Sequence, residues 1–323
     1  MAGAVWITGA EGFVGGWLLR ALADRGLPAA ALSLFPEQLP AALPALRLDL
    51  AEAARADPGA AVADLDRLPP PRGLVHLAAL SFPPACEAAP GLAKAVNVVG
   101  PARLYQQLLA RWPELPVVHV SSGQVYQPQA GPLGEDQPLE PVNVYGATKL
   151  QGEAVALGMR DRGHRVTVAR PFNHTGAGQA ASFALPSFAL RIAQLEGRGG
   201  GALDVGRLDS VRDFLHVRQV CDCYLALLDR AGELDLVNVC SGVGRPMQEL
   251  LDGLLQRARV AVSLRQDPAR GRGGADADAL VGDPARLAGL LGAAPVLDLD
   301  RLLDELLEDA RARLSAGESL DGA

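Results

Sequence analysis

Tyr145 and Lys149 are the residues of this chain whose types and spacing most directly indicate chemistry. Lysine and arginine together number 30, yet Lys94 and Lys149 are the only lysines. Where arginine serves almost every cationic role, a lysine four residues after a tyrosine indicates work that a guanidinium cannot do, such as tuning a phenol while hydrogen-bonding a ribose. On a helix the two side chains share one face. We therefore predict that Tyr145 is a proton donor and that Lys149, through its charge, lowers the pKa of the phenol.

A glycine-rich turn follows the first apolar segment of the chain. In TGAEGFVGG (8–16), Gly9, Gly12 and Gly15 have GxxGxxG spacing between a predicted strand and a predicted helix. Such glycines permit a tight turn and a close approach of the backbone to a pyrophosphate, which then lies at the helix N-terminus. The position of the motif predicts dinucleotide binding, and the alternative is a purely structural turn.

The other half of the dinucleotide site is less distinctive. No acidic residue stands at 33–35, where the second strand should end and where an acid would hold the adenosine ribose of NAD. No arginine stands there to bind a 2′-phosphate either, so we expect NADP(H) or NAD(H). Asp49 follows the third predicted strand and could accept a hydrogen bond from adenine, or could cap the next helix.

A serine pair lies at the end of another apolar segment. Ser121 and Ser122 in SSGQVY (121–126) fall at the carboxyl edge where open α/β sheets bind ligands. We expect Ser122 to converge with Tyr145 and Lys149 on a substrate carbonyl above the nicotinamide, so that Tyr145 protonates the oxygen while Ser122 holds it. The alternative is that Ser122 only caps the loop after the strand.

The elements that must position these groups alternate between apolar strands and amphipathic helices. Strands are predicted at 4–7, 30–35, 46–50, 73–79, 116–122 and 165–172, and helices at 15–25, 90–111 and 144–161. After residue 172 we expect a helix over 182–197, a loop around a short strand over 199–217, a helix over 216–231, a strand over 236–242 and helices over 247–258, 284–291 and 298–316. This βαβ rhythm predicts an α/β fold with a doubly wound parallel sheet and a smaller lobe.

Composition excludes several other classes of protein. A formal net charge of −7 argues against a nucleic-acid surface, and no apolar run is long enough to span a bilayer. The N-terminus lacks the pattern of a signal peptide, so we expect a cytoplasmic protein. The four cysteines lack the paired spacing of metal ligands and are expected to be buried thiols, so no metal site is predicted.

Five segments in order along the chain resemble the extended short-chain dehydrogenase/reductase family. They are TGAEGFVGG, HLAA (76–79), SSGQVY, YGATK (145–149) and RPFNHTGAGQ (170–179). The resemblance implies a Rossmann-type fold and assigns the catalytic roles to Ser122, Tyr145 and Lys149. It also implies that the cofactor contacts Gly9, Glu11, Gly12, Phe13, Val14, Gly15, Asp49, Leu50, Leu77, Ala78, Ala79, Tyr145, Lys149 and Phe172.

The later segments are most similar to the GDP-4-keto-6-deoxy-D-mannose reductases, beside the related GDP-mannose 4,6-dehydratases. They are RPFNHTGAGQ, SVRDFLHVRQV (210–220), NVCSG (238–242) and DPAR (267–270). The resemblance implies that Asn173 meets the sugar-nucleotide pyrophosphate and that Arg212 and Arg270 bind the nucleotide. The full set of substrate contacts it implies is Ser81, Ser122, Gln124, Asn173, Arg191, Arg212 and Arg270.

The change of pattern after residue 172, with a return to the sheet farther on, predicts how the chain is divided. Residues 1–172, with 214–245 returning, would form the NAD(P)-binding domain. Residues 173–213 and 246–316 would form the nucleotide-sugar-binding lobe, and 317–323 a tail. The family commonly pairs through the tyrosine-bearing helix and its neighbour, so we expect a homodimer.

Gln124 is the decisive departure from the dehydratases. Those enzymes place a glutamate two residues after the serine or threonine as the base for eliminating water, and an amide cannot serve as that base. The sequence therefore favours reduction of the C4 ketone of a GDP-4-keto-6-deoxyhexose, giving GDP-D-rhamnose from GDP-4-keto-6-deoxy-D-mannose. A nucleotide-sugar 4-epimerase that retains NAD is the first alternative. A dehydratase-like enzyme or a cofactor-binding protein without turnover is the second.

Overall fold

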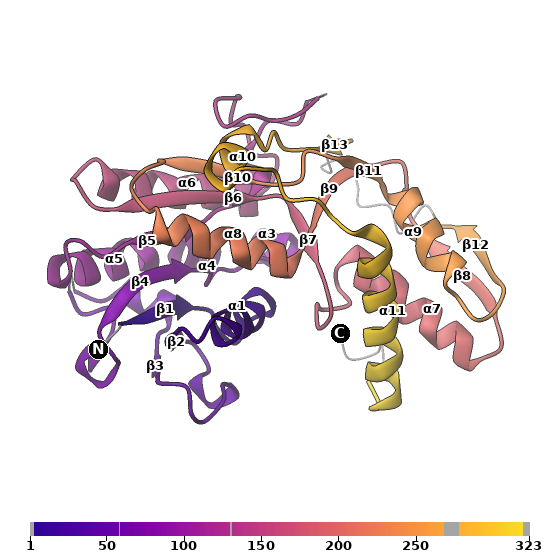
Figure 1. Ribbon diagram of the computed structural model, residues 1–323, viewed down its shortest axis with the longest axis horizontal. Coiled ribbons are helices and arrows are strands. Elements are labelled where there is room, and N and C mark those ends of the chain that lie inside the picture. Colours follow the sequence, from indigo (N-terminus) through magenta and orange to yellow (C-terminus); the bar gives the residue numbers. More distant parts are fainter. Residues whose placement is uncertain (1–2, 58, 130, 268–277, 319–323) are drawn as a thin grey trace.

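The computed structural model describes residues 3–57, 59–129, 131–267 and 278–318. A larger region is built on a parallel sheet, and a smaller lobe with the C-terminal helix lies beside it (Figure 1). Arg270, which the resemblance assigns to substrate binding, lies outside the described residues, as do residues 319–323 of the predicted tail.

The sheet of the larger region has seven strands, all parallel. Their order is β10 (Leu236–Val239), β6 (Val166–Pro171), β5 (Val117–Val120), β4 (Pro71–His76), β1 (Ala4–Thr8), β2 (Ala29–Ser33) and β3 (Ala45–Arg47). Because both faces are covered, residues such as Trp6, Ile7 and Val118 are fully buried. The chain reverses its winding between β1 and β4, the switch point at which doubly wound sheets bind ligands. The predicted fold class is confirmed.

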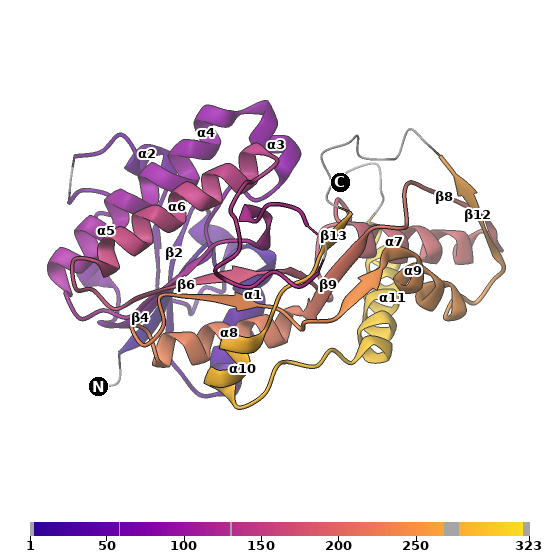
Figure 2. The same cartoon turned by 90° about the horizontal axis from the view of Figure 1, so that it is seen from above.

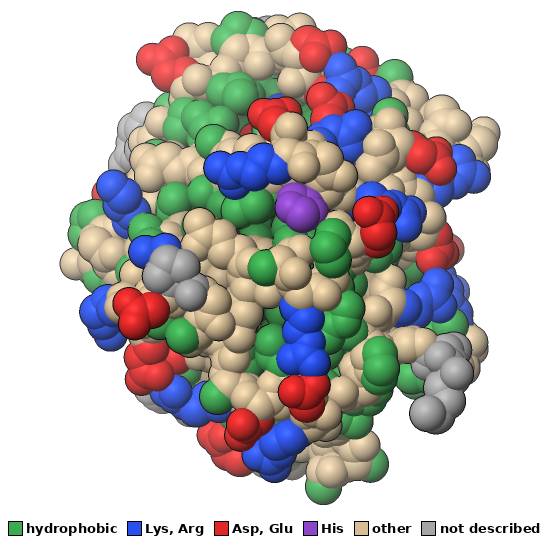
Figure 3. All heavy atoms as spheres, turned by 90° about the vertical axis from the view of Figure 1, so that its left-hand side faces the viewer, with side chains coloured by type: hydrophobic (Ala, Val, Ile, Leu, Met, Phe, Trp, Pro, Cys, Tyr) green, Lys and Arg blue, Asp and Glu red, His purple; other side chains and the backbone are tan. Residues whose placement is uncertain are grey.

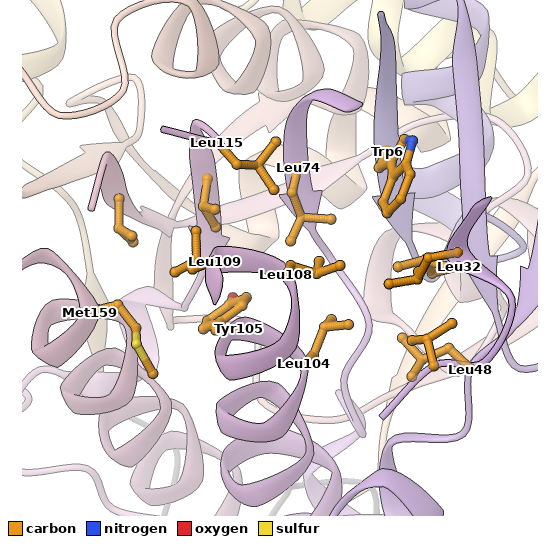
Figure 4. Packing of buried hydrophobic residues seen from close by; sticks show 14 of the residues in the cluster. Trp6, Leu32, Leu48, Leu74, Leu104, Tyr105, Leu108, Leu109, Leu115 and Met159 are labelled. Atoms are coloured by element: carbon orange, nitrogen blue, oxygen red, sulfur yellow. The ribbon is translucent and has the colours of Figure 1, made fainter. Parts of the chain in front are cut away.

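Helices cover both faces of this sheet (Figure 2). One face carries α2 (Leu50–Ala53), α3 (Pro83–Ala88), α4 (Pro90–Lys94), α5 (Gly100–Arg111) and α6 (Val144–Arg160), and the other carries α1 (Phe13–Asp24), α8 (Val217–Asp229) and α10 (Ala285–Leu291). Short 3₁₀ turns lie at η1 (Pro36–Gln38), η2 (Leu65–Arg67) and η4 (Gly123–Val125). Leu104 and Leu108 of α5 point toward Leu74 of the sheet, with Trp6 farther along the same layer (Figure 4).

The predicted helix over 90–111 is interrupted by a π-helical segment, η3 (Ala95–Val99). Pro101 lacks the N–H that would bond the carbonyl of Asn97, so the regular helical pattern cannot continue through this turn. The side chain of Asn97 is buried and binds the backbone N–H and carbonyl of Leu80 at 2.8 and 3.1 Å. The interruption therefore places a polar group under the loop that follows β4.

The lobe is held by α7 (Ala184–Gly197), α9 (Met247–Gln256) and α11 (Leu299–Ser315), which share one hydrophobic core. Its strands are β7 (Asn173–Thr175), β8 (Gly201–Val205), β9 (Val211–His216), β11 (Gly244–Pro246), β12 (Val262–Gln266) and β13 (Ala279–Leu280). Two strands, β8 and β9, occupy the stretch where one short strand is expected. Strand β12 is missed from the sequence because it is an exposed edge strand whose parallel partner β8 is distant in the chain.

Charge distribution, helix hydropathy and cysteine burial can be described for this structure. On the face of the larger region that points away from the lobe, acidic and basic side chains are interspersed and form no patch of one sign (Figure 3). Among the described helices, none is both long enough and apolar enough to cross a bilayer. All four cysteines are buried and free, and burial raises the pKa of each thiol.

Candidate active site

A cleft of about 900 Å³ lies between the carboxyl ends of the parallel strands and the lobe. It brings together every predicted site residue that the structure describes. These are Gly9, Glu11, Gly12, Phe13, Val14, Gly15, Asp49, Leu50, Leu77, Ala78, Ala79, Ser81, Ser122, Gln124, Tyr145, Lys149, Phe172, Asn173, Arg191 and Arg212. Their convergence from distant segments makes this cleft the candidate active site.

The glycine-rich turn leaves room for a ligand against its backbone. Gly9 has a φ of +69°, and a Cβ there would lie 3.0 Å from the backbone of Ala78. A Cβ at Gly15 would lie 2.3 Å from the carbonyl oxygen of Gly9, so only glycine lets α1 begin this close to β1. The first turn of α1 carries no acidic residue that would repel an anion. This cradle fits the pyrophosphate of a dinucleotide.

The Tyr145 phenol lies beside the Ser122 hydroxyl. Burial raises the pKa of Tyr145 to about 12, although a hydrogen bond from Ser122 acts in the opposite direction. Ser122 Oγ also accepts a hydrogen bond from the backbone N–H of Gln124 at 3.1 Å, so it caps the following turn and faces the phenol at the same time. At neutral pH Tyr145 therefore holds its proton next to a second hydroxyl.

Asn143 links Gln124 to the tyrosine-bearing helix. Its Oδ1 accepts from Gly146 N at 2.8 Å and caps α6, while its Nδ2 donates to Gln124 Oε1 at 3.0 Å. One side chain thus fixes both the start of the helix that carries Tyr145 and the amide that replaces the dehydratase base.

Lys149 is buried one turn after Tyr145. Burial lowers its pKa from 10.5 to about 8, against the favourable charge of Glu153, which lies one turn farther along α6. Its ammonium donates a hydrogen bond to the carbonyl of Val120, at the end of β5. In this arrangement Lys149 is anchored to the sheet edge, and the Tyr145 phenol is held by Ser122.

A buried polar network lies beneath these residues. Glu153 accepts two hydrogen bonds from Arg170, at 2.9 and 2.7 Å, and one from the Ser121 hydroxyl. The Arg170 guanidinium lies 4.7 Å from the centre of the Tyr126 ring. Both adjacent serines line the cleft, but the Ser121 hydroxyl turns to the buried Glu153 and the Ser122 hydroxyl turns to Tyr145. Sequence reasoning missed Glu153, although its place one turn after Lys149 is a signal that could have identified it.

The loop after β7 is fastened by both regions of the molecule. Trp17 of α1 donates to the carbonyl of Ala177 at 3.0 Å, and Glu305 of α11 accepts from the N–H of Ala177 at 2.8 Å. His216 Nε2 lies 3.0 Å from Glu305, and its Nδ1 accepts from the N–H of Arg218, so the neutral imidazole can donate to the carboxylate. These contacts position the segment that begins with Asn173, and no local pattern in the sequence announces them.

The lobe side of the cleft carries arginines and the start of α7. Arg212 of β9 is buried and donates to the carbonyl of Val211 at 2.9 Å, whereas the Arg207 side chain is half exposed and pairs with Asp209 and Asp278. Ser182 and Ser187, near the N-terminus of α7, line the same wall. Arg207 and the two serines were not predicted from the sequence.

Asp49 has the capping role that the sequence offered as one of two alternatives. Its Oδ1 accepts from the N–H groups of Ala51 and Glu52 at 2.8 and 3.2 Å, which caps α2. The residue also lines the cleft, so capping does not remove it from the dinucleotide end of the site.

Known proteins resemble this chain along most of its length. The model of the NAD dependent epimerase/dehydratase family matches residues 5–240. GDP-6-deoxy-D-mannose reductase of Pseudomonas aeruginosa is 36% identical over 250 residues, which cover 76% of this chain and 82% of that protein. GDP-6-deoxy-D-talose 4-dehydrogenase of Aggregatibacter actinomycetemcomitans is 30% identical over 69% of this chain and 74% of its own length.

The fold agrees with these matches. The structure of RMD from Pseudomonas aeruginosa complexed with NADPH superimposes with a TM-score of 0.81 at 33% identity, covering 96% of this chain and 99% of that one. The chain belongs to the NAD-dependent epimerase/dehydratase family.

Proposed function

We propose that the protein uses NAD(P)H to reduce the C4 ketone of a GDP-4-keto-6-deoxyhexose, converting GDP-4-keto-6-deoxy-D-mannose to GDP-D-rhamnose. The observation that carries the proposal is the protonated Tyr145 beside Ser122 in the cleft, on the helix that also carries Lys149. The relatives named for GDP-6-deoxy sugars support the choice of substrate.

Tyr145 supplies the proton in this reaction. Because its pKa is raised to about 12, the phenol is protonated at neutral pH and can donate to the ketone oxygen as that oxygen gains charge. Ser122 donates a hydrogen bond to the same oxygen and then to the phenolate that is left. Reduction of a ketone needs an acid that is protonated at the start of the reaction, and Tyr145 meets this need.

The positive charge of Lys149 offsets the negative charge that Tyr145 gains when it gives up its proton. With a pKa of about 8 it is mostly protonated at pH 7, so its ammonium favours the tyrosine phenolate as the proton leaves. The glycine cradle at Gly9 and Gly15 would hold the pyrophosphate of the cofactor, whose reduced nicotinamide supplies the hydride when bound. The arginines of the lobe, with Arg212 the most buried of those lining the cleft, would bind the diphosphate of the sugar nucleotide.

Gln124 argues for a reductase over a dehydratase. The amide is held by Asn143 at 3.0 Å and has no carboxylate to remove a proton from the sugar. A 4-epimerase with retained NAD is the remaining enzymatic alternative, because the family model includes epimerases.

One assay separates these activities. Purified protein is incubated with GDP-4-keto-6-deoxy-D-mannose and either NADH or NADPH, and nicotinamide oxidation and the sugar product are measured. We expect one cofactor oxidised per sugar reduced. GDP-mannose with NADP⁺ or NAD⁺ should yield no keto sugar, and its appearance would reject the reductase-only proposal. Interconversion of C4 epimers without net cofactor use would instead identify an epimerase.

The homodimer and the cytoplasmic location expected from the sequence stay predictions. Light scattering tests the first, and a mass equal to one chain of 33.6 kDa at the concentrations used for activity would contradict it.

A further inference from the structure

Glu11 places a carboxylate at the adenosine end of the cleft, where the sequence offers none at the usual position. We propose that Glu11 selects the cofactor, favouring NADH with its free 2′-hydroxyl over NADPH with its 2′-phosphate. This inference rests on the proposed role of the cleft in binding a nicotinamide dinucleotide.

The position of the Glu11 side chain is fixed by a backbone contact across the fold. Its Oε1 accepts a hydrogen bond of 3.0 Å from the N–H of Leu34, the first residue after β2. The end of β2 is where dinucleotide-binding folds hold the adenosine ribose, with an acid there binding the 2′-hydroxyl of NAD. Residues 33–35 carry no acid, so Glu11 reaches this place from the glycine-rich turn after β1.

The second carboxylate oxygen of Glu11 lacks a partner. Oε2 is buried without a hydrogen bond from any described residue. A buried acceptor without a donor is unfavourable, and a ribose hydroxyl bound at this end of the cleft would bring a donor for this carboxylate. A 2′-phosphate is dianionic or nearly so, brings no equivalent donor at neutral pH, and adds negative charge beside a carboxylate.

None of the described cations that line the cleft lies at this end to offset that charge. The side chains that line it near Glu11 are Leu32, Leu34, Leu48, Asp49 and Leu50, so the second ionisable group is also an acid. Among the described residues, the cations that line the cleft are Lys149 on α6 and Arg191, Arg207 and Arg212 of the lobe.

Arg47 of β3 lies two residues before Asp49 and already forms ion pairs with acidic neighbours. It binds Glu52 at 2.7 Å and lies 3.5 Å from Asp49, and its side chain is 54% exposed. A 2′-phosphate would therefore meet two carboxylates and an arginine whose charge is shared with its own acidic neighbours. The solved Pseudomonas aeruginosa RMD structure is a complex with NADPH, whereas the inference predicts that this chain binds NADH more tightly.

The test is direct binding of each cofactor to the full chain, without sugar substrate. Dissociation constants for NADH and NADPH are measured by calorimetry for the wild type, Glu11→Gln and Glu11→Ser. Glu37→Gln is the matched control, because Glu37 is an exposed acid on the neighbouring turn η1 that does not line the cleft. Glu11→Gln keeps an acceptor for Leu34 N–H, so it removes the charge while preserving that contact.

We expect the wild type to bind NADH roughly tenfold more tightly than NADPH, or more. Glu11→Gln and Glu11→Ser should reduce or invert the ratio of the NADPH to the NADH dissociation constant, mainly because NADPH binds more tightly. Glu37→Gln should leave this ratio unchanged. Thermal unfolding shows whether each variant is folded. Equal or tighter NADPH binding by the wild type, or an unchanged ratio in folded Glu11→Gln, would overturn this inference alone. Failure to bind either dinucleotide would overturn the proposed function as well.

Discussion

The two sides of the cleft hold charge in different ways. On the sheet side, Lys149, Glu153 and Arg170 are each no more than 4% exposed, and each has a fixed partner. In the lobe, the side chains of Arg207, which lines the cleft, and of Arg265, which lies outside it, are 50% and 70% exposed and pair with acids. Charges under the reacting groups are thus preorganised and withdrawn from water, whereas most lobe charges stay solvated and can adapt to a ligand. The comparison predicts that substitutions on the sheet side change chemistry or folding, and that those on the lobe side change affinity.

The largest effect should come from removing the proton donor. Tyr145→Phe should lower kcat roughly 10²- to 10⁴-fold, because the ketone oxygen loses its acid, while cofactor binding is retained. Steady-state kinetics with the keto sugar measure this. Tyr105→Phe is the control, since Tyr105 is a fully buried tyrosine that bonds His119 away from the cleft, at 2.7 Å. A comparable loss of kcat in both variants would show that burial of tyrosine, and not its place in the site, determines the effect.

The next effect compares two ion pairs of the same bidentate geometry and opposite exposure. Arg170→Met should lower the free energy of unfolding by about 3–5 kcal/mol, because it leaves the Glu153 carboxylate buried without its partner. Arg265→Met breaks the exposed pair with Asp204 and should change the free energy of unfolding by at most about 1 kcal/mol. Unfolding in denaturant measures the free energy of unfolding of both variants. Equal losses of stability would contradict the difference between buried and exposed ion pairs.

Lys149 provides a pH-dependent test of the buried side. Its folded pKa of about 8 lies below its unfolded value of 10.5, so between these values the unfolded chain binds more protons and the stability contribution of this residue rises with pH. Below pH 8 the buried charge is a cost. Lys149→Met should therefore be more stable than the wild type at pH 7, by up to about 3 kcal/mol, and lose that advantage toward pH 10.5. A difference that is independent of pH between 7 and 10.5 would contradict the lowered pKa.

The smallest expected effect concerns the affinity of the lobe for the GDP sugar. Arg212→Met should raise KM for the GDP sugar roughly tenfold with little change in kcat, because a charge-assisted contact to phosphate is lost. Arg245→Met is the matched control, since Arg245 lies opposite Arg212 in the β11–β9 register but does not line the cleft. If the two variants raise KM equally, Arg212 acts through the strand and not through the ligand.

Much of this site follows from short-range spacing along the chain. Tyr145 and Lys149 are four residues apart on α6, and the glycines of the first turn have fixed spacing between β1 and α1. Such patterns survive folding because one helix or one turn determines the relative positions of their members. The strands of the parallel sheet were predictable for the same reason, since strands covered on both faces read as continuous apolar runs.

Contacts between distant segments could not be read in this way. The exposed strand β12 has no apolar pattern of its own and exists because β8 pairs with it. The fastening of the loop after β7 by Trp17 and Glu305 joins residues more than a hundred positions apart. No local propensity reports such pairings, because their free energy depends on which surfaces meet after the chain has folded.

By itself, the sequence determined the family, the parallel sheet and the residues able to transfer a proton, because these depend on residue type and local spacing. Only the tertiary structure decided the partner of the neighbouring serine, since the Ser121 hydroxyl turns to Glu153 while Ser122, as the sequence predicted, meets Tyr145. It also brought the carboxylate of Glu11 to Leu34, supplying at the end of β2 the acid that the local sequence lacks. The physical reason is that a hydrogen bond between two loops forms only after the parallel packing of β1 and β2 has set them side by side.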